Sequence, residues 1–429
     1  MSVVYLKEAK LGGPEESGEI TRLVSKMLHD IEIGGEKEVQ KLSRKFDYFS
    51  GPIKVSQELI EKAENSISEG LKEDINYARE NVAKFASSQL NSINEFQTEI
   101  RPGLIAGQKS IPISSAGCYV PGGRYSHISS AIMTVTTAKA AGVKNVTVCS
   151  PPRDGVNIPN EVIYAAKSCG ADQILTLGGV QAIASLALGF FDCPKSDIIV
   201  GPGNQFVTQA KKLLFGRVGI DLLAGPTDSL IIADSKADPL LVATDLVSQA
   251  EHGWNSPVWL LSDDRKLCLK VLNLIPNQIN SLPEINRANA AMAWDNFGQV
   301  ILCSDREEIA QEADKISPEH LSIQAENLDW WFDRLSAYGS LFLGEETTVS
   351  FGDKVSGPNH VLPTSGAARY TGGLSVHNFR KIVTWQKSTK DAVKEQAIKT
   401  ANISRFEGME GHARAADVRL KKFFPDQNL

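Results

Sequence analysis

The fold is constrained most by an alternation that begins near Ser115. Short apolar runs that end in turn residues, NVTVCS, DQILTL and DIIVG, alternate with stretches of helical periodicity such as SAIMTVTTAKAAG and VQAIASLALG. This alternation is typical of βαβ units around a parallel sheet whose two faces are both covered. Short apolar runs of the same kind recur in SLIIAD, VWLLSDD, GQVILCSD and GSLFLGE. The sequence therefore predicts two α/β lobes.

The two ends of the chain have a different residue pattern. Roughly the first hundred residues repeat apolar positions at three- and four-residue steps, which predicts helices, and the stretch beyond Leu374 is rich in charge and helix formers. We therefore predict an α/β fold with two incomplete Rossmann-like parallel-sheet lobes, a helical N-terminal region and a C-terminal helical arm. The expected division is residues 1–117 plus 228–372 for the first lobe, 118–227 for the second, and 373–429 for the arm.

Composition excludes several classes of partner. With 429 residues and 42% hydrophobic content, the chain can bury two or more lobes. A net charge of −6 gives no electrostatic reason to expect nucleic acid or an anionic membrane, so a small-molecule substrate fits better. The six cysteines form no CxxC pair and are expected to be reduced. MSVVYLKEAK lacks the pattern of a signal peptide and no apolar stretch could span a bilayer, so a cytoplasmic location is expected.

Glycine and proline turns follow three of the predicted strands, at residues 150–152, 178–180 and 201–203. Ligands of open parallel sheets bind beyond the carboxyl ends of the strands, and backbone N–H groups at such turns can cradle phosphates. Loops also use glycine for purely conformational reasons about as often. No GxGxxG follows these strands, so the common dinucleotide fingerprint is missing.

Side chains that can bind a metal or move protons are spread over the second half of the chain. Gln249 and His252 stand three apart in a predicted helix, so both would project from one face. Asp353 and His412 would complete a mixed nitrogen and oxygen set of the kind that zinc or manganese accepts. On residue type alone, a lone histidine near a helix end is more often a cap or core residue, and glutamine is an uncommon ligand.

Glu319 and His320 are adjacent, so on a helix or turn their side chains diverge by about 100°. One could act on a substrate hydroxyl while the other handles a water molecule, and histidine is suited to general-base work near neutral pH. The alternative is a purely structural role at the first turn of a helix, with Ser317 as its cap.

Eight ordered segments resemble the histidinol dehydrogenase family over nearly the whole chain: GCYVPGG, GGVQAIASLALG, GPGNQFVTQAKK, GIDLLAGPTDSLIIAD, SQAEHG, SPEHL, GDKVSGPNHVLPTSG and EGMEGHAR. The resemblance implies one zinc ion per subunit that orients the substrate without redox change. It also implies site residues of four kinds: the zinc ligands Gln249, His252, Asp353 and His412; the acid/base pair Glu319 and His320; the NAD contacts Tyr119, Gln181 and Asn204; and the substrate contacts Thr227, His360 and Glu407, together with His320 and the four ligands.

The reaction implied by the resemblance is a four-electron oxidation of a primary alcohol to a carboxylate, with two NAD molecules and a bound aldehyde between the steps. His320 would take the alcohol proton, and Glu319 would activate the water that hydrates the aldehyde. The resemblance also implies a domain-swapped homodimer whose C-terminal arm completes the partner's active site. A route through a cysteine thiohemiacetal has less support, because neither Cys118 nor Cys149 has an evident activator in the sequence.

Three further segments resemble the sulfopropanediol dehydrogenase branch of the family: NLDWWFDRLSAYGSLFLGEE, TSGAARYTGGLSVHNFRKIVTWQ and GMEGHARAADVRL. Members of this branch oxidise (R)-2,3-dihydroxypropane-1-sulfonate to sulfolactate. Arg124 and His127 add anion donors to the loop after Tyr119, with Lys354 as a further candidate, and the planar fork of an arginine suits a sulfonate. Glu407 would suit a cationic substrate, so oxidation of L-histidinol to L-histidine is the alternative. A zinc hydrolase with Glu319 as its base is a remote alternative.

Overall fold

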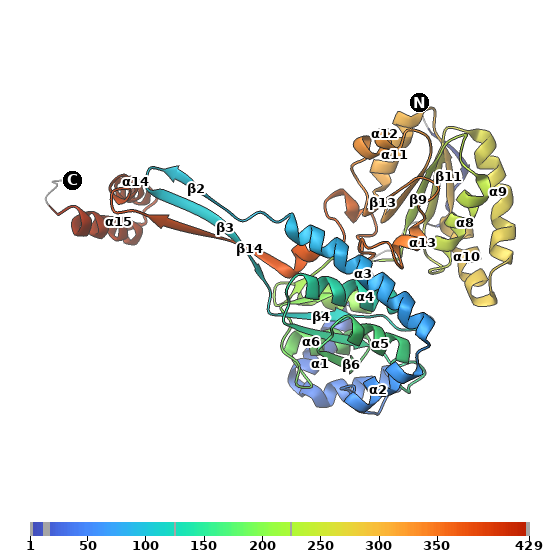
Figure 1. Ribbon diagram of the computed structural model, residues 1–429, viewed down its shortest axis with the longest axis horizontal. Coiled ribbons are helices and arrows are strands. Elements are labelled where there is room, and N and C mark those ends of the chain that lie inside the picture. The colour runs from blue at the N-terminus through green and yellow to red at the C-terminus, as the bar shows by residue number, and fades with distance from the viewer. Residues whose placement is uncertain (1–2, 12–17, 124–125, 224, 426–429) are drawn as a thin grey trace. The chain divides into compact units, whose positions relative to one another are not determined.

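The computed structural model describes residues 3–11, 18–123, 126–223 and 225–425 (Figure 1). The chain divides into two compact units, Met1–Leu90 with Ile113–Phe379 and Asn91–Pro112 with Arg380–Leu429. In the described part of the chain, no helix is long and apolar enough to cross a membrane.

The first unit contains a six-stranded sheet in the order β1-β11-β10-β9-β12-β13. Only the pairing of β1 with β11 is antiparallel, and the other four pairings within this sheet are parallel. The predicted strands of this lobe are therefore confirmed, while β1 and β12 are additional. The strands are β1 (Val4–Lys7), β9 (Ser229–Ala233), β10 (Val258–Ser262), β11 (Gln299–Leu302), β12 (His320–Gln324) and β13 (Ser340–Leu343).

Helices cover both faces of this sheet because successive strand residues point to opposite sides. Ile231 packs with α8 (Pro239–Ala250), α9 (Arg265–Asn280) and α10 (Glu284–Phe297). Its neighbours Leu230 and Ile232 pack with α11 (Arg306–Ile316) and α12 (Leu328–Arg334). Burial on both sides explains why these strands are continuous apolar runs in the sequence. The short elements α13 (Val349–Gly352), η2 (Ala367–Arg369) and η3 (Val376–Phe379) follow β13.

The same unit contains a five-stranded, fully parallel sheet in the order β6-β5-β4-β7-β8. Because β5 lies on one side of β4 and β7 on the other, the chain changes direction across the sheet at β4. The strands are β4 (Ser115–Tyr119), β5 (Asn145–Ser150), β6 (Gln173–Thr176), β7 (Ile198–Val200) and β8 (Gly219–Ile220). The helices between them are α4 (Ile128–Ala140), α5 (Asn160–Ser168), α6 (Gly179–Leu188) and α7 (Gln205–Leu214).

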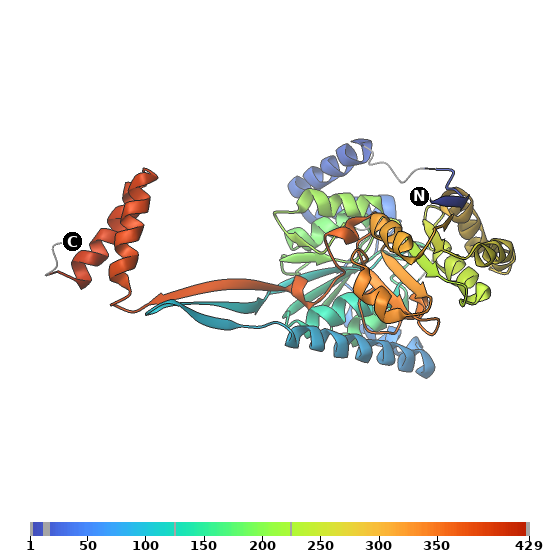
Figure 2. The same cartoon turned by 90° about the horizontal axis from the view of Figure 1, so that it is seen from above.

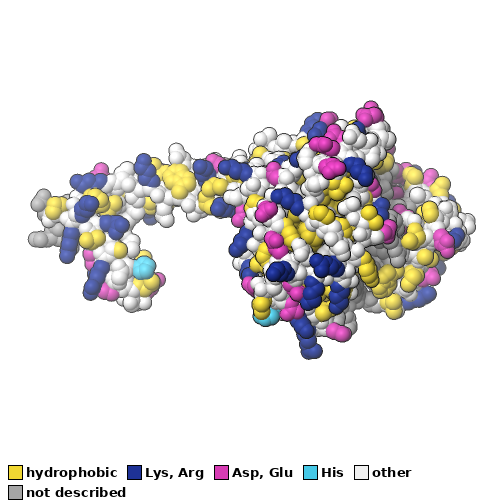
Figure 3. Space-filling model, turned by 90° about the horizontal axis from the view of Figure 1, so that it is seen from below, with side chains coloured by type: hydrophobic (Ala, Val, Ile, Leu, Met, Phe, Trp, Pro, Cys, Tyr) yellow, Lys and Arg dark blue, Asp and Glu magenta, His cyan; other side chains and the backbone are white. Residues whose placement is uncertain are grey.

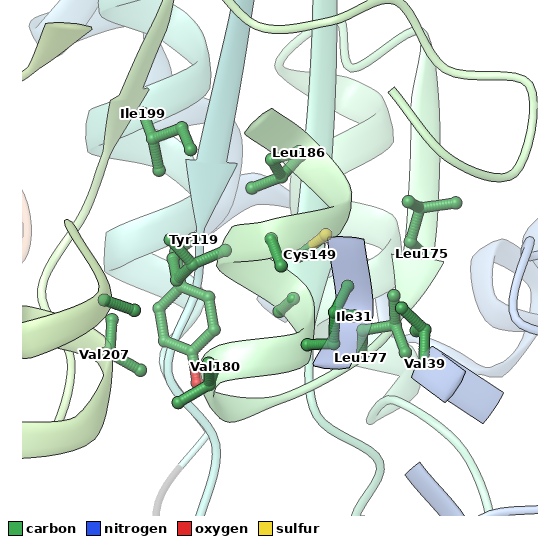
Figure 4. Close-up of a cluster of buried hydrophobic side chains, with 14 of the residues drawn as sticks. Ile31, Val39, Tyr119, Cys149, Leu175, Leu177, Val180, Leu186, Ile199 and Val207 are labelled. Atoms are coloured by element: carbon green, nitrogen blue, oxygen red, sulfur yellow. The ribbon is translucent and has the colours of Figure 1, made fainter. Parts of the chain in front are cut away.

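The N-terminal region is helical, as predicted, but it packs on a different lobe from the one expected. The first helix, α1 (Gly18–Leu42), packs against α6 and α7, and α2 (Gln57–Ser66) packs against α5. Ile31 and Val39 of α1 share a core with Leu175 of β6 (Figure 4). The expectation that residues 1–117 join residues 228–372 is therefore wrong for these helices, since their apolar stripe is buried by the five-stranded lobe. The short η1 (Ser43–Asp47) and the long α3 (Glu69–Asn91) complete the region.

The second unit contains a three-stranded antiparallel sheet and a pair of helices (Figure 2). The sheet order is β14-β3-β2, with β2 (Phe96–Arg101), β3 (Leu104–Pro112) and β14 (Arg380–Ser388). The helices α14 (Val393–Phe406) and α15 (Glu410–Phe423) pack on each other through a small apolar cluster. The expectation of a purely helical arm over residues 373–429 is corrected, because the arm starts with a strand and includes residues 96–112. All side chains of β2 are exposed, so the alternation that identifies a half-buried strand is absent.

Candidate active site

The three residues expected at the NAD site line one pocket, beyond the carboxyl ends of the five-stranded sheet. Tyr119 ends β4, Gln181 lies in the first turn of α6, and Asn204 is the N-cap of α7. The structure thus brings together three side chains that are far apart in the sequence, at the edge where open parallel sheets bind ligands. Most of the remaining side chains around the pocket are apolar: Leu23, Met27, Phe46, Val180 and Phe206.

Hydrogen bonds hold the turn at the start of α6. The Asp47 carboxylate accepts from the Gly178 N–H at 3.2 Å and from Gln181 Nε2 at 2.9 Å. The Tyr119 hydroxyl accepts from the Gly179 N–H at 3.2 Å, and Figure 4 shows this hydroxyl beside Val180. The N–H groups of Gly178 and Gly179 thus already have partners within the protein, which favours a conformational role for these two glycines over a phosphate cradle. Asp47 had no local sequence signal, since it reaches the turn only through the packing of α1 on α6.

A second group of side chains lies beside the six-stranded sheet. It is found at the amino ends of the strands β9, β12 and β13. Its centre is Asp353, which caps the C-terminus of α13. The Asp353 carboxylate lies 3.6 Å from His252 Nε2 and 3.6 Å from His320 Nε2. The cofactor candidates thus lie at the carboxyl ends of one sheet, whereas the metal and acid/base candidates lie at the amino ends of the other.

Gln249 and His252 lie at the end of α8, close to where the sequence placed them. The helix ends at Ala250, so His252 lies just beyond it, and its N–H donates to the Gln249 carbonyl at 3.3 Å. The Gln249 side chain is buried, and its Oε1 has no hydrogen-bond partner among the residues described. A buried amide oxygen without a partner is unusual and is consistent with a ligand that the protein alone does not supply.

Glu319 and His320 lie at the entry to a strand. Ser317 has a φ of 51° and caps the C-terminus of α11, and His320 is the first residue of β12. The alternative in which Ser317 caps the start of a helix is therefore wrong, and so is the divergence expected for a helix or turn. The two side chains still approach each other, with 3.8 Å between His320 Nδ1 and Glu319 Oε2.

Asp228, just before β9, fixes the position of Glu319. Its Oδ1 accepts from the Glu319 N–H at 2.6 Å, and Glu319 Oε2 accepts from the Asp228 N–H at 3.2 Å. Asp228 Oδ2 also accepts from the Ser365 N–H at 2.8 Å. Burial raises the pKa of the Glu319 carboxyl well above its usual range, and the negative charges of Asp228 and Asp353 raise it further. Glu319 is therefore a buried carboxyl that keeps its proton to a higher pH than an exposed glutamate does.

The His320 imidazole is buried beside two carboxylates. Both ring nitrogens lack a hydrogen-bond partner within the described residues, because the distances to Glu319 and Asp353 exceed hydrogen-bonding range. Its ring also lies 6.0 Å from the Phe342 ring, measured between centroids. An imidazole in this environment has the geometry of a general base whose hydrogen-bond partner is a bound ligand.

The donor set fits zinc, but it is incomplete within the first unit. His252 Nε2 and Asp353 Oδ2 are 3.6 Å apart, whereas two ligand atoms of a tetrahedral zinc site lie about 3.4 Å apart. The unpartnered oxygen of Gln249 is the candidate for a third donor. In the described ranges, no group of three or more His, Cys, Asp or Glu side chains has the geometry to hold a metal ion. A site built here therefore needs the amide of Gln249 and a further ligand.

The expected substrate contacts of the first unit lie around this group. Thr227 adjoins Asp228 in the loop before β9. His360 is held in place by its ring nitrogens, with 2.8 Å from Nδ1 to the Asp353 carbonyl oxygen and 3.3 Å from Nε2 to Ser130 Oγ on α4. Arg124 lies outside the described residues.

His127, the N-cap of α4, lies close to the same group. Burial lowers its pKa to about 4, and the positive charges of His360 and Lys354 contribute to the lowering. Lys354 follows Asp353 and is exposed. Two potential anion donors named from the sequence are therefore near the candidate site.

Glu407 and His412 belong to the second unit. Glu407 caps the C-terminus of α14, and His412 lies in the first turn of α15. Both side chains are exposed. The site residues predicted from the sequence are thus divided between two separately packed units.

The cysteines do not suit covalent catalysis. All six are free and buried. Burial raises the pKa of the Cys118 thiol to about 12 and the pKa of Cys149 well above its usual value. A reactive cysteine needs a lowered pKa, so the thiohemiacetal route has no support at these positions.

Comparison with known proteins identifies the family of the chain. Residues 13–420 match the histidinol dehydrogenase family. Sulfopropanediol 3-dehydrogenase of Ruegeria pomeroyi is 59% identical over 429 residues, which is 100% of this chain and 99% of that protein. Histidinol dehydrogenase of Methanothermobacter thermautotrophicus is 37% identical over 417 residues, 97% of this chain and 96% of that protein. The crystal structure of histidinol dehydrogenase from Elizabethkingia anophelis superposes with a TM-score of 0.90 at 34% identity, covering 97% of this chain and 94% of that one.

The fold and the comparisons together define an NAD-linked dehydrogenase. The chain belongs to the histidinol dehydrogenase family, as the sequence resemblance indicated. The family uses NAD and zinc.

Proposed function

We propose that this protein is a zinc-dependent dehydrogenase that oxidises (R)-2,3-dihydroxypropane-1-sulfonate to sulfolactate. The primary alcohol, two NAD⁺ and one water would give the carboxylate, two NADH and three protons, with the aldehyde held between the two steps. The observation that carries the substrate is the 59% identity to a sulfopropanediol 3-dehydrogenase along the whole chain. L-histidinol is the second candidate, because the family includes histidinol dehydrogenases at 37% identity and Glu407 would suit a cation.

We assign the zinc to Gln249, His252 and Asp353, with His412 of the partner subunit as the fourth ligand. When bound, zinc would hold and orient the substrate hydroxyls and favour loss of the alcohol proton. The unpartnered Gln249 oxygen and the short distance between His252 and Asp353 support this assignment. One zinc ion would then serve each subunit of a homodimer.

The second unit supports a dimer through its surface. Apolar side chains lie among Lys and Arg on this unit (Figure 3). Phe406, at the end of α14, is 95% exposed, and Ile403, Met409 and Val418 are also exposed. Exposed apolar groups of this size usually mark an interface, and a second copy of the chain would cover them while bringing His412 and Glu407 to its site.

His320 and Glu319 would move the protons. His320 Nε2 faces Asp353 and would accept the alcohol proton as the hydride leaves for nicotinamide. His320 Nδ1 faces Glu319, whose raised pKa suits it to take a proton from the water that hydrates the aldehyde. The backbone N–H of Asp228 would keep the Glu319 carboxyl in place during both steps.

NAD would bind in the pocket of Tyr119, Gln181 and Asn204. This pocket shares Pro121, Gly122, Gly123 and Pro151 with a neighbouring hollow that His127 and Arg153 line. The two hollows therefore adjoin at these four residues. The nicotinamide would lie at the shared residues, on the side of His127.

The sulfonate would be bound by fixed hydrogen-bond donors and positive charges. A sulfonate is ionised at every pH at which the enzyme folds, so it favours side chains such as Lys354, His127 and Arg124. Thr227, His360 and Glu407 would bind the vicinal hydroxyls. Lys354 adjoins Asp353 in the chain, and His127 lies within electrostatic range of His360, Lys354 and His252.

The substrate is tested by NADH formation with both enantiomers of sulfopropanediol and with L-histidinol, at one fixed zinc concentration. We expect turnover of the R enantiomer, with two NADH per substrate. Lys354→Met should raise the KM for sulfopropanediol, whereas Lys167→Met, on an exposed lysine of α5, should not. Turnover of L-histidinol alone would overturn the substrate assignment.

The shared site is tested by mixing two inactive variants, His320→Asn and His412→Ala. If His412 serves the partner, each mixed dimer contains one intact site, and a randomised mixture recovers about a quarter of the wild-type activity. If His412 serves its own subunit, the mixture stays inactive.

A further inference from the structure

The pocket beyond the five-stranded sheet has a negative wall. Among the described residues that line it, Asp47 has the only charged side chain, and no Lys or Arg lines it. Lys45, two residues before Asp47, places its ammonium 4.9 Å from the centroid of the Phe46 ring but is not part of the lining. A ligand in this pocket is therefore exposed to a carboxylate that no cation of the lining neutralises.

The Asp47 carboxylate is fixed in this position by its partners. It accepts from the Gly178 N–H and from Gln181 Nε2, both at the start of α6. The positive end of the helix dipole favours a negative charge there, so the α6 N-terminus already has its anion. A cofactor phosphate placed at this turn would meet the Asp47 carboxylate instead of free N–H groups.

The pocket suits the adenosine half of a dinucleotide. Met27, Phe46 and Phe206 offer apolar surface to an adenine ring. A carboxylate at such a position can accept hydrogen bonds from the hydroxyls of the adenosine ribose, whereas sites that bind the 2′-phosphate of NADP place an arginine nearby. Arg153 lines the neighbouring hollow, not this pocket, and lies toward His127. The charges thus favour adenosine at Asp47 and the pyrophosphate nearer to the residues that the two hollows share.

We infer that Asp47 determines the choice of cofactor: its carboxylate accepts from the adenosine ribose hydroxyls of NAD and repels the 2′-phosphate of NADP. This inference rests on the proposed position of NAD in the pocket. It adds a specificity-determining residue that belongs to the N-terminal helical region.

The test is an Asp47→Asn variant assayed with both cofactors. The asparagine Oδ1 keeps an acceptor for the Gly178 N–H while the charge is removed. We expect the ratio of kcat/KM for NADP to kcat/KM for NAD to rise by about tenfold or more, mainly through a lower KM for NADP. The ratio is measured on one preparation, so a loss of folded enzyme cannot change it. The matched control is Asp192→Asn, which removes the same charge from a side chain that is 91% exposed on the same lobe; its ratio should stay that of the wild type.

A pocket variant, Phe206→Ala, separates the two ways in which the inference can fail. If Phe206→Ala raises the KM for NAD while Asp47→Asn leaves the cofactor ratio unchanged, the pocket binds NAD and the role of Asp47 is refuted. If neither variant changes the KM for NAD or the ratio, NAD does not bind in this pocket, and the proposed cofactor site is wrong together with the inference.

Discussion

A buried ion pair between Lys211 of α7 and Asp221, just after β8, holds the turn that precedes Asn204. Lys211 Nζ also donates to the Gly201 carbonyl at 3.0 Å, and Asp221 Oδ2 accepts from the Gly201 N–H at 2.7 Å. Both side chains are almost completely buried. We predict that Lys211→Met loosens this turn and destabilises the protein.

The magnitude follows from what the substitution leaves behind. Methionine has a similar length, so the main loss is the partner of a buried Asp221 carboxylate. Removing one member of a buried ion pair typically costs about 3–5 kcal/mol. Asp221 would keep the N–H donors of Gly201 and Leu222, the latter at 2.7 Å, so we expect the lower end, about 3 kcal/mol.

The free energy of unfolding is measured in urea for the wild type, Lys211→Met, Lys211→Met/Asp221→Asn and the exposed control Lys167→Met. The control should lie within about 0.5 kcal/mol of the wild type. The double variant should recover about half of the loss, because no uncompensated charge remains buried. The KM for NAD should rise in Lys211→Met while kcat changes little. A loss below about 1 kcal/mol in Lys211→Met would refute the reasoning.

Three further predictions concern other parts of the first unit. Gly201→Ala should lower the free energy of unfolding by more than about 2 kcal/mol and raise the KM for NAD. The reason is that φ is 111° at this position and a Cβ would lie 2.1 Å from the Tyr119 carbonyl oxygen. Urea unfolding and NAD kinetics that match the wild type would contradict this. Burial holds the pKa of His127 at about 4 instead of 6.5. As pH falls, the unfolded chain therefore takes up a proton at His127 before the folded chain does. This destabilises the metal-free protein progressively between pH 6.5 and pH 4, by up to about 3 kcal/mol. In EDTA, His127→Asn should therefore lose less unfolding free energy than the wild type over this pH range, and equal losses would show that the His127 pKa is not lowered. Cys118→Ser and Cys149→Ala, assayed separately for NADH formation, should each keep the wild-type kcat within about threefold because neither thiol is activated; an inactive but folded variant would revive the thiohemiacetal route.

Local patterns in the sequence were enough for most of the α/β architecture. Strands such as β9 are apolar throughout because helices bury both of their faces, and α1 shows helical periodicity because only one stripe of it, including Val24, Ile31 and Val39, is buried. These signals arise between residues that are near each other in the chain. The strands β2 and β14 gave no such signal, because their side chains are mostly exposed. Each of them is paired with β3 through backbone hydrogen bonds.

The candidate site was predictable only as a set of residue types. The sequence and its resemblance to a family named the acid/base pair, the metal-binding candidates and the cofactor residues. They did not name Asp228 or Asp47, whose roles come from hydrogen bonds to residues far away in the chain. No local pattern marks a carboxylate whose partners are brought to it by packing.

The sequence by itself determined that this chain forms parallel α/β lobes and carries the side chains of a family of NAD-linked dehydrogenases. Tertiary structure alone decided that Asp353, His252 and His320 come together, and at which ends of the strands they do so. The cofactor candidates meet at the carboxyl ends of one sheet, while Asp353, His252 and His320 meet at the amino ends of the other. The reason is physical: periodicity reports whether a residue is buried, but the direction in which neighbouring strands and helix ends converge is set by contacts between distant segments.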